Sequence, residues 1–266
     1  MNILNLIDQS KGNVNYNIIR FPDGEPHIFL DELDRKKDIK VICRITCPED
    51  LFIVMQVGNI LNRQGISFLL TISYLMSMRM DRVMSFNEAY SLEIVSNCIN
   101  SINPSTVEII EPHSDKTKSL IKKSVAISCI DMIYDEDCVI CFPDGGAGAR
   151  YSYLFHHRIT LYGSKVRDAS TGKLSGFRIE NPEDYQSGPI LVIDDLCDGG
   201  GTFVGIANEI RKFAPAAKLK IFVTHMVNKN GITSLSKNYD EVVFTDSFFD
   251  WNTIELPKNV KCKPIF

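Results

Sequence analysis

The chain has 266 residues, a formal net charge of −4 at pH 7, and 44% hydrophobic and 23% charged residues, a composition typical of a soluble globular protein. The weak negative charge gives no support for binding to nucleic acid or to a membrane surface, and no apolar run approaches the roughly 20 residues that a membrane span needs. Because no signal-peptide core stands near the N-terminus and the eight cysteines are scattered, we expect a cytoplasmic protein with reduced thiols.

Strand-like runs and helical patterns alternate along the chain. Strands are predicted at residues 39–45, 66–72, 107–110, 139–142, 158–162, 190–193, 219–224 and 241–245. Helices are predicted at residues 49–62, 86–100, 202–213 and 231–237. This alternation is typical of an α/β fold with doubly wound parallel sheets. The order strand, loop, helix occurs in two halves, so we expect two closely packed domains, residues 1–118 and 119–266.

Three candidate sites lie in the first half. A Pro-Asp-Gly turn at residues 20–25 exposes Phe21, Asp23 and Glu25 together. Arg79 follows the end of a predicted strand, and His113 stands where the next strand ends. Arginine suits a polyphosphate because its guanidinium makes bidentate contacts. Taken by themselves, these features are also typical of an ordinary turn, a surface salt-bridge cluster and a structural histidine.

Two further candidates lie in the second half. Asp144 follows a predicted strand and is succeeded by a glycine turn that closes with Arg150. Lys165 and Arg167 lie in a polar loop between predicted strands, where the ordinary interpretation is a solvated charge run. The Cys-x-x-Cys at residues 138–141 has the spacing of half a zinc site, but no second pair completes it. Its position in a strand predicts buried thiols.

The most informative stretch is residues 190–202. Four apolar residues predict a strand buried on both faces, Asp194 and Asp195 stand at its end, and Thr202 takes the place of a helix N-cap. Between them, Asp198 and three glycines form a turn whose backbone N–H groups can approach an anion beside the positive end of a helix. An ordinary strand-turn-helix corner explains the glycines but not three carboxylates, which can hold ribose hydroxyls or Mg²⁺. We therefore predict a ribose-phosphate site.

Residues 194–202 resemble the phosphoribosyl-pyrophosphate (PRPP) loop that type I phosphoribosyltransferases share with ribose-phosphate pyrophosphokinases (PRPP synthetases), with Gly199 in place of a Thr. The loop alone does not separate these two families. The other motifs resemble the synthetases: a Phe-x-Asp-Gly-Glu turn, a strand-end His, a Pro-Asp-x-Gly-Gly loop and a Lys-x-Arg loop. Because the transferases lack the whole set, the chain is identified as a divergent member of the synthetase family. Ser77, Met80 and Ala147 depart from the family's motifs.

The resemblance implies two type I phosphoribosyltransferase-like domains, the first on the ATP side and the second carrying the ribose-phosphate loop. It also implies Mg²⁺-dependent transfer of the β,γ-pyrophosphoryl group of ATP to the C1 hydroxyl of ribose 5-phosphate, giving PRPP and AMP. In the family the Phe-x-Asp-Gly-Glu turn reaches the adenine pocket of a neighbouring subunit. A homo-oligomer with a shared ATP site is therefore implied.

The resemblance also assigns roles to the candidate residues. Lys165 and Arg167 would be catalytic and close over the transferring group. His113 and Asp144 would hold Mg²⁺ on the triphosphate. The residues implied to bind ATP are Phe21, Asp23, Glu25 and Arg79. Those implied to bind the ribose phosphate, the first two at the ribose hydroxyls, are Asp194, Asp195, Asp198, Gly199, Gly200, Gly201 and Thr202.

Two alternatives stay open. The first is the same chemistry on ADP-ribose, giving ADP-ribose pyrophosphate for NAD⁺ synthesis. Gly199 favours it, because the missing threonine side chain opens space for a phosphate that is esterified further. The second is a non-catalytic, synthetase-associated regulatory subunit. The presence of both loop cations, of His113 and of Asp144 argues against this second alternative.

Overall fold

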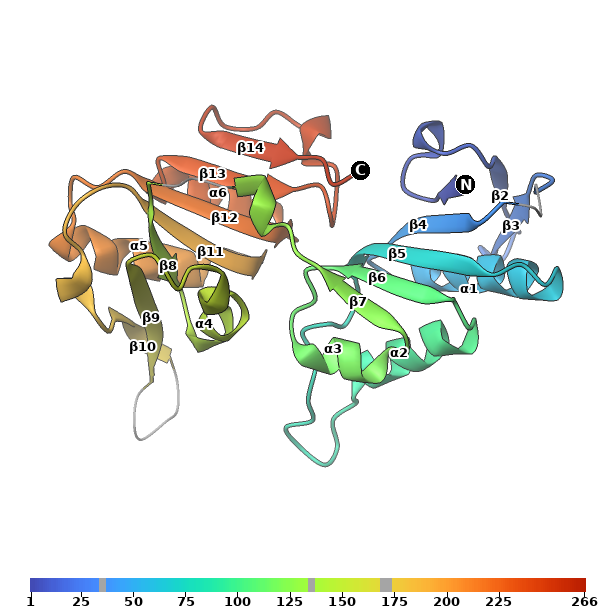
Figure 1. Cartoon of the computed structure of the whole chain (residues 1–266), viewed down its shortest axis with the longest axis horizontal. Coiled ribbons are helices and arrows are strands. Elements are labelled where there is room, and N and C mark those ends of the chain that lie inside the picture. Colours follow the sequence, from blue (N-terminus) through green and yellow to red (C-terminus); the bar gives the residue numbers. More distant parts are fainter. Residues whose placement is uncertain (34–36, 134–136, 168–173) are drawn as a thin grey trace. The chain divides into compact units, whose positions relative to one another are not determined.

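The computed structural model describes residues 1–33, 37–133, 137–167 and 174–266. The chain divides into two compact units, Met1–Ser128 and Cys129–Phe266 (Figure 1). The boundary that we expected after residue 118 falls inside helix α3 (Asp115–Leu120). The division comes later because α3 and strand β7 (Ser124–Ile127) complete the sheet layer of the first unit. Within the described ranges, no helix is both long enough and apolar enough to cross a membrane.

The first unit is built on a five-stranded parallel sheet with the order β1-β4-β5-β6-β7, and a separate antiparallel hairpin, β2–β3, is attached to helix α1. The Gln56 side chain of α1 makes this attachment, since it accepts from the Ile28 N–H (3.0 Å) and donates to the Pro26 carbonyl (2.8 Å). The remaining elements of the unit are β1 (Asn2–Asn5), β2 (Tyr16–Arg20), β3 (Pro26–Leu30), β4 (Ile39–Ile45), α1 (Pro48–Arg63), β5 (Phe68–Leu75), α2 (Ser91–Ser101) and β6 (Thr106–Ile110), with a 3₁₀ turn at Gln9–Lys11.

Helix α1 illustrates how local sequence sets the elements of this unit. Pro48 occupies the first helical position, where its missing N–H is not needed, and the Asp50 carboxylate accepts from the Cys47 N–H (3.2 Å). Further along, Val57 and Leu61 recur on one face and are buried against the sheet. The helix is therefore fixed at its start by capping and along its length by its apolar face.

The second unit is built on a seven-stranded sheet with the order β10-β9-β8-β11-β12-β13-β14. All neighbouring pairs are parallel except β9 and β10, which pair antiparallel. Its elements are β8 (Val139–Phe142), α4 (Gly145–Tyr151), β9 (Thr160–Arg167), β10 (Leu174–Ile179), β11 (Ile190–Cys197), α5 (Gly201–Phe213), β12 (Leu219–Met226), α6 (Lys229–Asn238), β13 (Glu241–Thr245) and β14 (Val260–Lys263), with 3₁₀ turns at Ile130–Ile133, Ser152–Leu154, Pro182–Asp184 and Trp251–Thr253.

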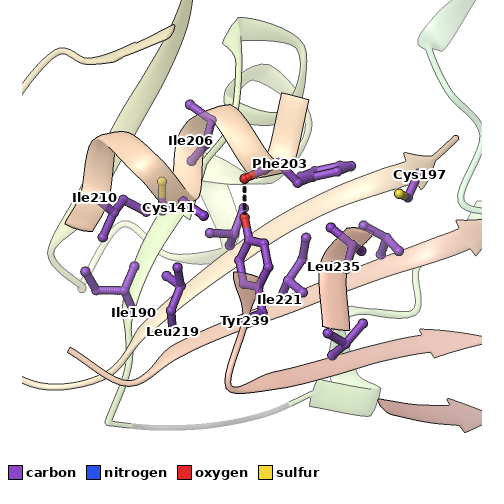
Figure 2. Close-up of a cluster of buried hydrophobic side chains, with 14 of the residues drawn as sticks. Cys141, Ile190, Cys197, Phe203, Ile206, Ile210, Leu219, Ile221, Leu235 and Tyr239 are labelled. Carbon is purple, nitrogen blue, oxygen red and sulfur yellow. Dashed lines mark hydrogen bonds between the residues drawn. The ribbon is translucent and has the colours of Figure 1, made fainter. Parts of the chain in front are cut away.

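A single buried core holds α5 and α6 against this sheet (Figure 2). Tyr239 follows α6, and its hydroxyl donates to the Phe203 carbonyl of α5 (2.8 Å). The one polar atom of this side chain is therefore hydrogen-bonded inside the core. Burial raises the pKa of the Cys141 and Cys197 thiols to about 12. Cys138 and Cys141 are both buried, as predicted.

The predicted strands are confirmed, and three of them, β4, β8 and β13, have the predicted bounds. The prediction of a polar loop beginning at residue 163 is wrong, because β9 continues to Arg167 and pairs with β10, a strand that we did not predict. The partner strand supplies backbone hydrogen bonds that a polar sequence can use as well as an apolar one. The second predicted helix begins later than expected, at Ser91.

Candidate active site

The predicted ribose-phosphate loop joins β11 to α5. Asp194 and Asp195 lie inside β11 rather than at its end, because β11 stays paired with β12 as far as Cys197 and Met226. The burial of the pair is pronounced: Asp194 is 8% exposed and Asp195 only 1%. In this arrangement Asp194 is the more accessible of the two carboxylates, and Asp198, in the turn that follows, is exposed.

Helix α5 begins one residue earlier than predicted, and Gly200, not Thr202, is its N-cap. Gly200 has a φ of 83°, and a Cβ at this position would lie 3.0 Å from the Ser234 Cβ. A residue with a side chain would therefore be both strained and crowded here. Thr202 lies in the first helical turn. A Cβ on Gly199 would meet nothing within 4 Å, so space is open beside this residue.

The prediction of a glycine turn after Asp144 is wrong, because Asp144 caps a helix, α4, that begins at Gly145. Arg150, near the end of α4, connects this motif to the acidic pair. Its Nη2 donates to Asp194 Oδ1 at 3.0 Å and also to Asp195 Oδ1. The arginine side chain is only 19% exposed. Burial opposes the charge of Arg150, but the adjacent carboxylates outweigh this effect and raise its pKa. Burial, together with the charge of Asp195, raises the pKa of Asp194.

Asp144 connects the same motif to β9. Its Oδ1 accepts from the Gly146 N–H (3.0 Å) and the Ala147 N–H (3.1 Å), which makes it the N-cap of α4. Its Oδ2 accepts from Lys165 Nζ (2.8 Å). Burial opposes ionisation of Asp144, but the hydrogen bond and charge of Lys165, together with the two backbone hydrogen bonds, outweigh burial and lower the pKa of this carboxyl. Since the charge of Asp144 also raises the pKa of Asp194, the three ion pairs form one electrostatic cluster.

This cluster, formed by Asp144, Arg150, Lys165, Asp194 and Asp195, brings together three motifs that are far apart in the sequence. One guanidinium faces two carboxylates in the acidic pair, so a single cation stands against two acids. Carboxylate oxygens next to a deficit of positive charge fit Mg²⁺, which takes oxygen ligands and leaves positions for substrate phosphates. Across the described residues, no group of three or more His, Cys, Asp or Glu side chains is arranged to hold a metal, so substrate would have to complete the coordination.

In the first unit, the turn between β2 and β3 has the predicted form. The Gly24 N–H donates to the Phe21 carbonyl (2.8 Å), and the Asp23 side chain accepts from the Glu25 N–H (3.1 Å). Phe21 is 45% exposed, and its ring lies 6.2 Å from that of His27. An exposed aromatic ring beside two exposed acids is what the predicted adenine contact needs, and the assignment stays a prediction.

The other two motifs of this unit meet at Asp81, which is 5% exposed. Asp81 accepts from Arg82 Nε (2.9 Å), and its pKa is lowered by this contact and further by the charges of Arg82 and His113. The exposed Arg79 lies two residues before Asp81, in the turn after β5. Because β5 and β6 are neighbours in a parallel sheet, their carboxyl ends bring these two loops together.

Some predicted associations stay untested. His113 lies in the first unit and Asp144 in the second, so a metal shared between them is still a prediction. The backbone of Arg167 belongs to β9, but its side chain and residues 168–173 lie outside the described part of the chain. Sequence reasoning did not propose Arg150 or Asp81 as site residues. Both had a signal, since Arg150 closes the motif that begins with Asp144, and Asp81 is a charged residue two positions after Arg79.

The two doubly wound units form a type I phosphoribosyltransferase-like double domain. The crystal structure of phosphoribosylpyrophosphate synthetase from Mycobacterium smegmatis matches all of this chain and 95% of its own, with a TM-score of 0.79 at 18% sequence identity. This match confirms the predicted fold class.

In sequence, the chain is a distant homologue of the ribose-phosphate pyrophosphokinases. It is 25% identical over 246 residues to the enzyme of Sulfurisphaera tokodaii, covering 85% of this chain and 82% of the relative. It is 26% identical over 261 residues to that of Pyrococcus furiosus, covering 91% of this chain and 87% of the relative. No protein-family model matches the chain. The predicted relationship to the synthetases is confirmed at this distance.

Proposed function

We propose that the protein is a Mg²⁺-dependent pyrophosphokinase that transfers the β,γ-pyrophosphoryl group of ATP to the C1 hydroxyl of ribose 5-phosphate, giving PRPP and AMP. The observation that carries this proposal is the cluster in the second unit. There, Lys165 forms an ion pair with Asp144, the N-cap of α4, and Arg150 of α4 forms ion pairs with both acids of β11. Distant homology to ribose-phosphate pyrophosphokinases gives independent support.

The acceptor would bind at the start of α5. Backbone N–H groups of the glycine turn and the positive end of this 13-residue helix suit a dianionic 5-phosphate. Asp194 and Asp195 lie in the strand that leads into the turn, so their carboxylates would orient the ribose hydroxyls. Arg150 would hold both carboxylates in place, because it contacts both.

The transfer itself needs positioning and charge neutralisation more than covalent chemistry. The acceptor oxygen bonds to the β-phosphorus while the bond from that phosphorus to the α-phosphate breaks and AMP leaves. Lys165 would place its ammonium group on the oxygens of the group in transfer, and Arg167 would assist. Mg²⁺ held by His113 and Asp144, with a second ion at the acidic pair, would supply further neutralisation of the triphosphate.

On the ATP side, Arg79 would grip phosphate oxygens, and Phe21, Asp23 and Glu25 would contact adenine in a neighbouring copy of the chain within a homo-oligomer. The exposure of Phe21 and of both acids in the β2–β3 turn supports this assignment. Stacking suits an exposed aromatic ring, and the carboxylates can accept from the exocyclic amine.

A second candidate acceptor is ADP-ribose, and the observation that favours it is the open space beside Gly199. A 5-phosphate that is esterified further carries less charge and needs room to leave the pocket. The reaction would be the same, with ADP-ribose pyrophosphate as the product.

The test is AMP release from ATP by the purified full chain with Mg²⁺ and either ribose 5-phosphate or ADP-ribose. Lys165→Ala should lower kcat by roughly 10²-fold, with little change in the KM for ATP, because its contact is made in the transition state. Lys261→Ala is the matched control, since it removes a lysine paired with Glu241 on the same sheet (2.8 Å). No AMP release with either acceptor would refute the proposal and favour a regulatory subunit.

A further inference from the structure

The turn after β11 rests directly on the N-terminal end of α6. The Val227 N–H donates to the Cys197 carbonyl (3.0 Å), which joins the chain before α6 to the end of β11. A Cβ on Gly231 would lie 2.2 Å from the Asp198 carbonyl oxygen, so only glycine allows the two backbones to come this close. The position of the turn is therefore set by α6 as well as by the strand that precedes it.

The Asn228 side chain connects the two segments with both ends of its amide. Its Oδ1 accepts from the Asn230 N–H (2.9 Å), which caps α6, and its Nδ2 donates to Asp198 Oδ1 (3.0 Å). These contacts fix the orientation of the amide. A flipped amide would present its oxygen to a carboxylate oxygen and its NH₂ group to a backbone N–H, and both contacts would be lost.

We infer that Asn228 is a positioning residue for the anion site: its Nδ2 holds the Asp198 carboxylate toward α6, which limits competition between this carboxylate and the acceptor phosphate for the backbone N–H groups of the turn. The inference rests on the proposed function, because it takes an acceptor with a phosphate group as the ligand of this turn. The physical need is clear. A carboxylate left to rotate in a turn built for an anion repels that anion and competes for the same donors.

The test uses two variants that both keep the helix cap. Asn228→Asp retains the capping oxygen but replaces the donor with a second carboxylate, and Asn228→Ser retains a capping oxygen without adding charge. Asn230→Asp is the matched control: it adds the same charge to the same exposed turn of α6 and leaves the Asn230 N–H in place. The full chain is used throughout, and thermal unfolding of each variant establishes that it folds.

The readouts are calorimetric affinities for ribose 5-phosphate and for inorganic phosphate, and the KM for each substrate in AMP release. Asn228→Asp should weaken the affinity for both anions by about tenfold or more, the scale of a hydrogen bond to a charged group. Asn228→Ser should weaken it by less, and Asn230→Asp by less than about twofold. The KM for ribose 5-phosphate should rise, while that for ATP should stay within about twofold. A merely structural role would move both KM values together.

Equal affinities in wild type and Asn228→Asp would overturn the inference and leave the proposed function intact. A wild type that binds phosphate, loses that affinity in Asn228→Asp and releases no AMP would support the inference and refute the proposed function. A wild type that binds neither ribose 5-phosphate nor phosphate overturns the inference as well, since no anion site then exists at this turn.

Discussion

Arg150 is the most informative residue to change, because its guanidinium compensates two buried carboxylates. Arg150→Met keeps a long side chain of helical propensity but leaves Asp194 and Asp195 without their cation. Breaking a buried ion pair from one side costs roughly 3–5 kcal/mol at neutral pH, because the remaining charge stays buried. For a unit of this size, that loss lowers the Tm by about 10 °C.

The penalty should depend on pH in a defined direction. The pKa of Asp194 is already raised in the folded chain by burial and by Asp195, so folding favours its protonated form. Its contribution to stability is present below the pKa of an unfolded aspartate, about 3.9, and is lost as pH rises through the folded pKa. Removal of Arg150 raises the folded pKa further. The destabilisation of Arg150→Met should therefore be largest at pH 7 and should shrink as pH falls toward 5.

The measurement is urea or thermal unfolding of wild type and variants at pH 7 and pH 5. Arg150→Lys should recover part of the loss, since it restores the charge but not the planar guanidinium whose Nη2 contacts both carboxylates. Arg178→Met is the control, because Arg178 pairs with Glu180 at the surface, where an ion pair contributes about 0–1 kcal/mol. The reasoning is contradicted if the free energy of unfolding of Arg150→Met lies within about 1 kcal/mol of the wild-type value at pH 7. It is also contradicted if the loss of stability is the same at both pH values.

Two further predictions concern metal and acceptor. His113→Ala and Asp144→Ala should each raise the Mg²⁺ concentration needed for half-maximal AMP release, with partial rescue by excess metal, and an unchanged Mg²⁺ dependence in both removes these residues from the metal site. Gly199→Thr should shift the kcat/KM ratio toward ribose 5-phosphate over ADP-ribose by about tenfold or more, because the new hydroxyl can donate to a dianionic phosphate and its Cβ meets no neighbour within 4 Å. Competition between the two acceptors measures the second effect, and a ratio that does not move shows that Gly199 has no part in the choice of acceptor.

Features that depend on local sequence were predictable here. Residues 190–193 are apolar because this strand is buried, and apolar residues also form the middle of 241–245, so both strands could be predicted from the sequence. The glycine turn after β11 and the helix that follows it could also be predicted from local sequence. Strand β10 could not be predicted, because its pairing with β9 is a contact between segments and the polar residues of β9 resemble those of a loop.

The same distinction applies to the candidate site. The acidic pair, Asp144 and Lys165 could each be proposed from a motif, but no local pattern indicates that Arg150 contacts both carboxylates. The helix N-cap is Gly200 and not the predicted Thr202. Gly200 lies close to Ser234 on another helix, and the local sequence does not show this contact. Asn228 is a residue type typical of a helix N-cap, but the sequence does not indicate its contact with Asp198.

The ion pair of Lys165 exchanges partners more readily than the ion pairs of Arg150. Lys165 and Asp144 have side chains that are 33% and 27% exposed, and such a pair contributes about 1 kcal/mol or less. At that strength, the populations with and without the contact differ by only about fivefold, so the lysine is released from Asp144 a substantial fraction of the time. Arg150, in contrast, is held between buried carboxylates. An incoming phosphate group can thus recruit Lys165 at little cost, while the strand that carries Asp194 and Asp195 keeps its geometry.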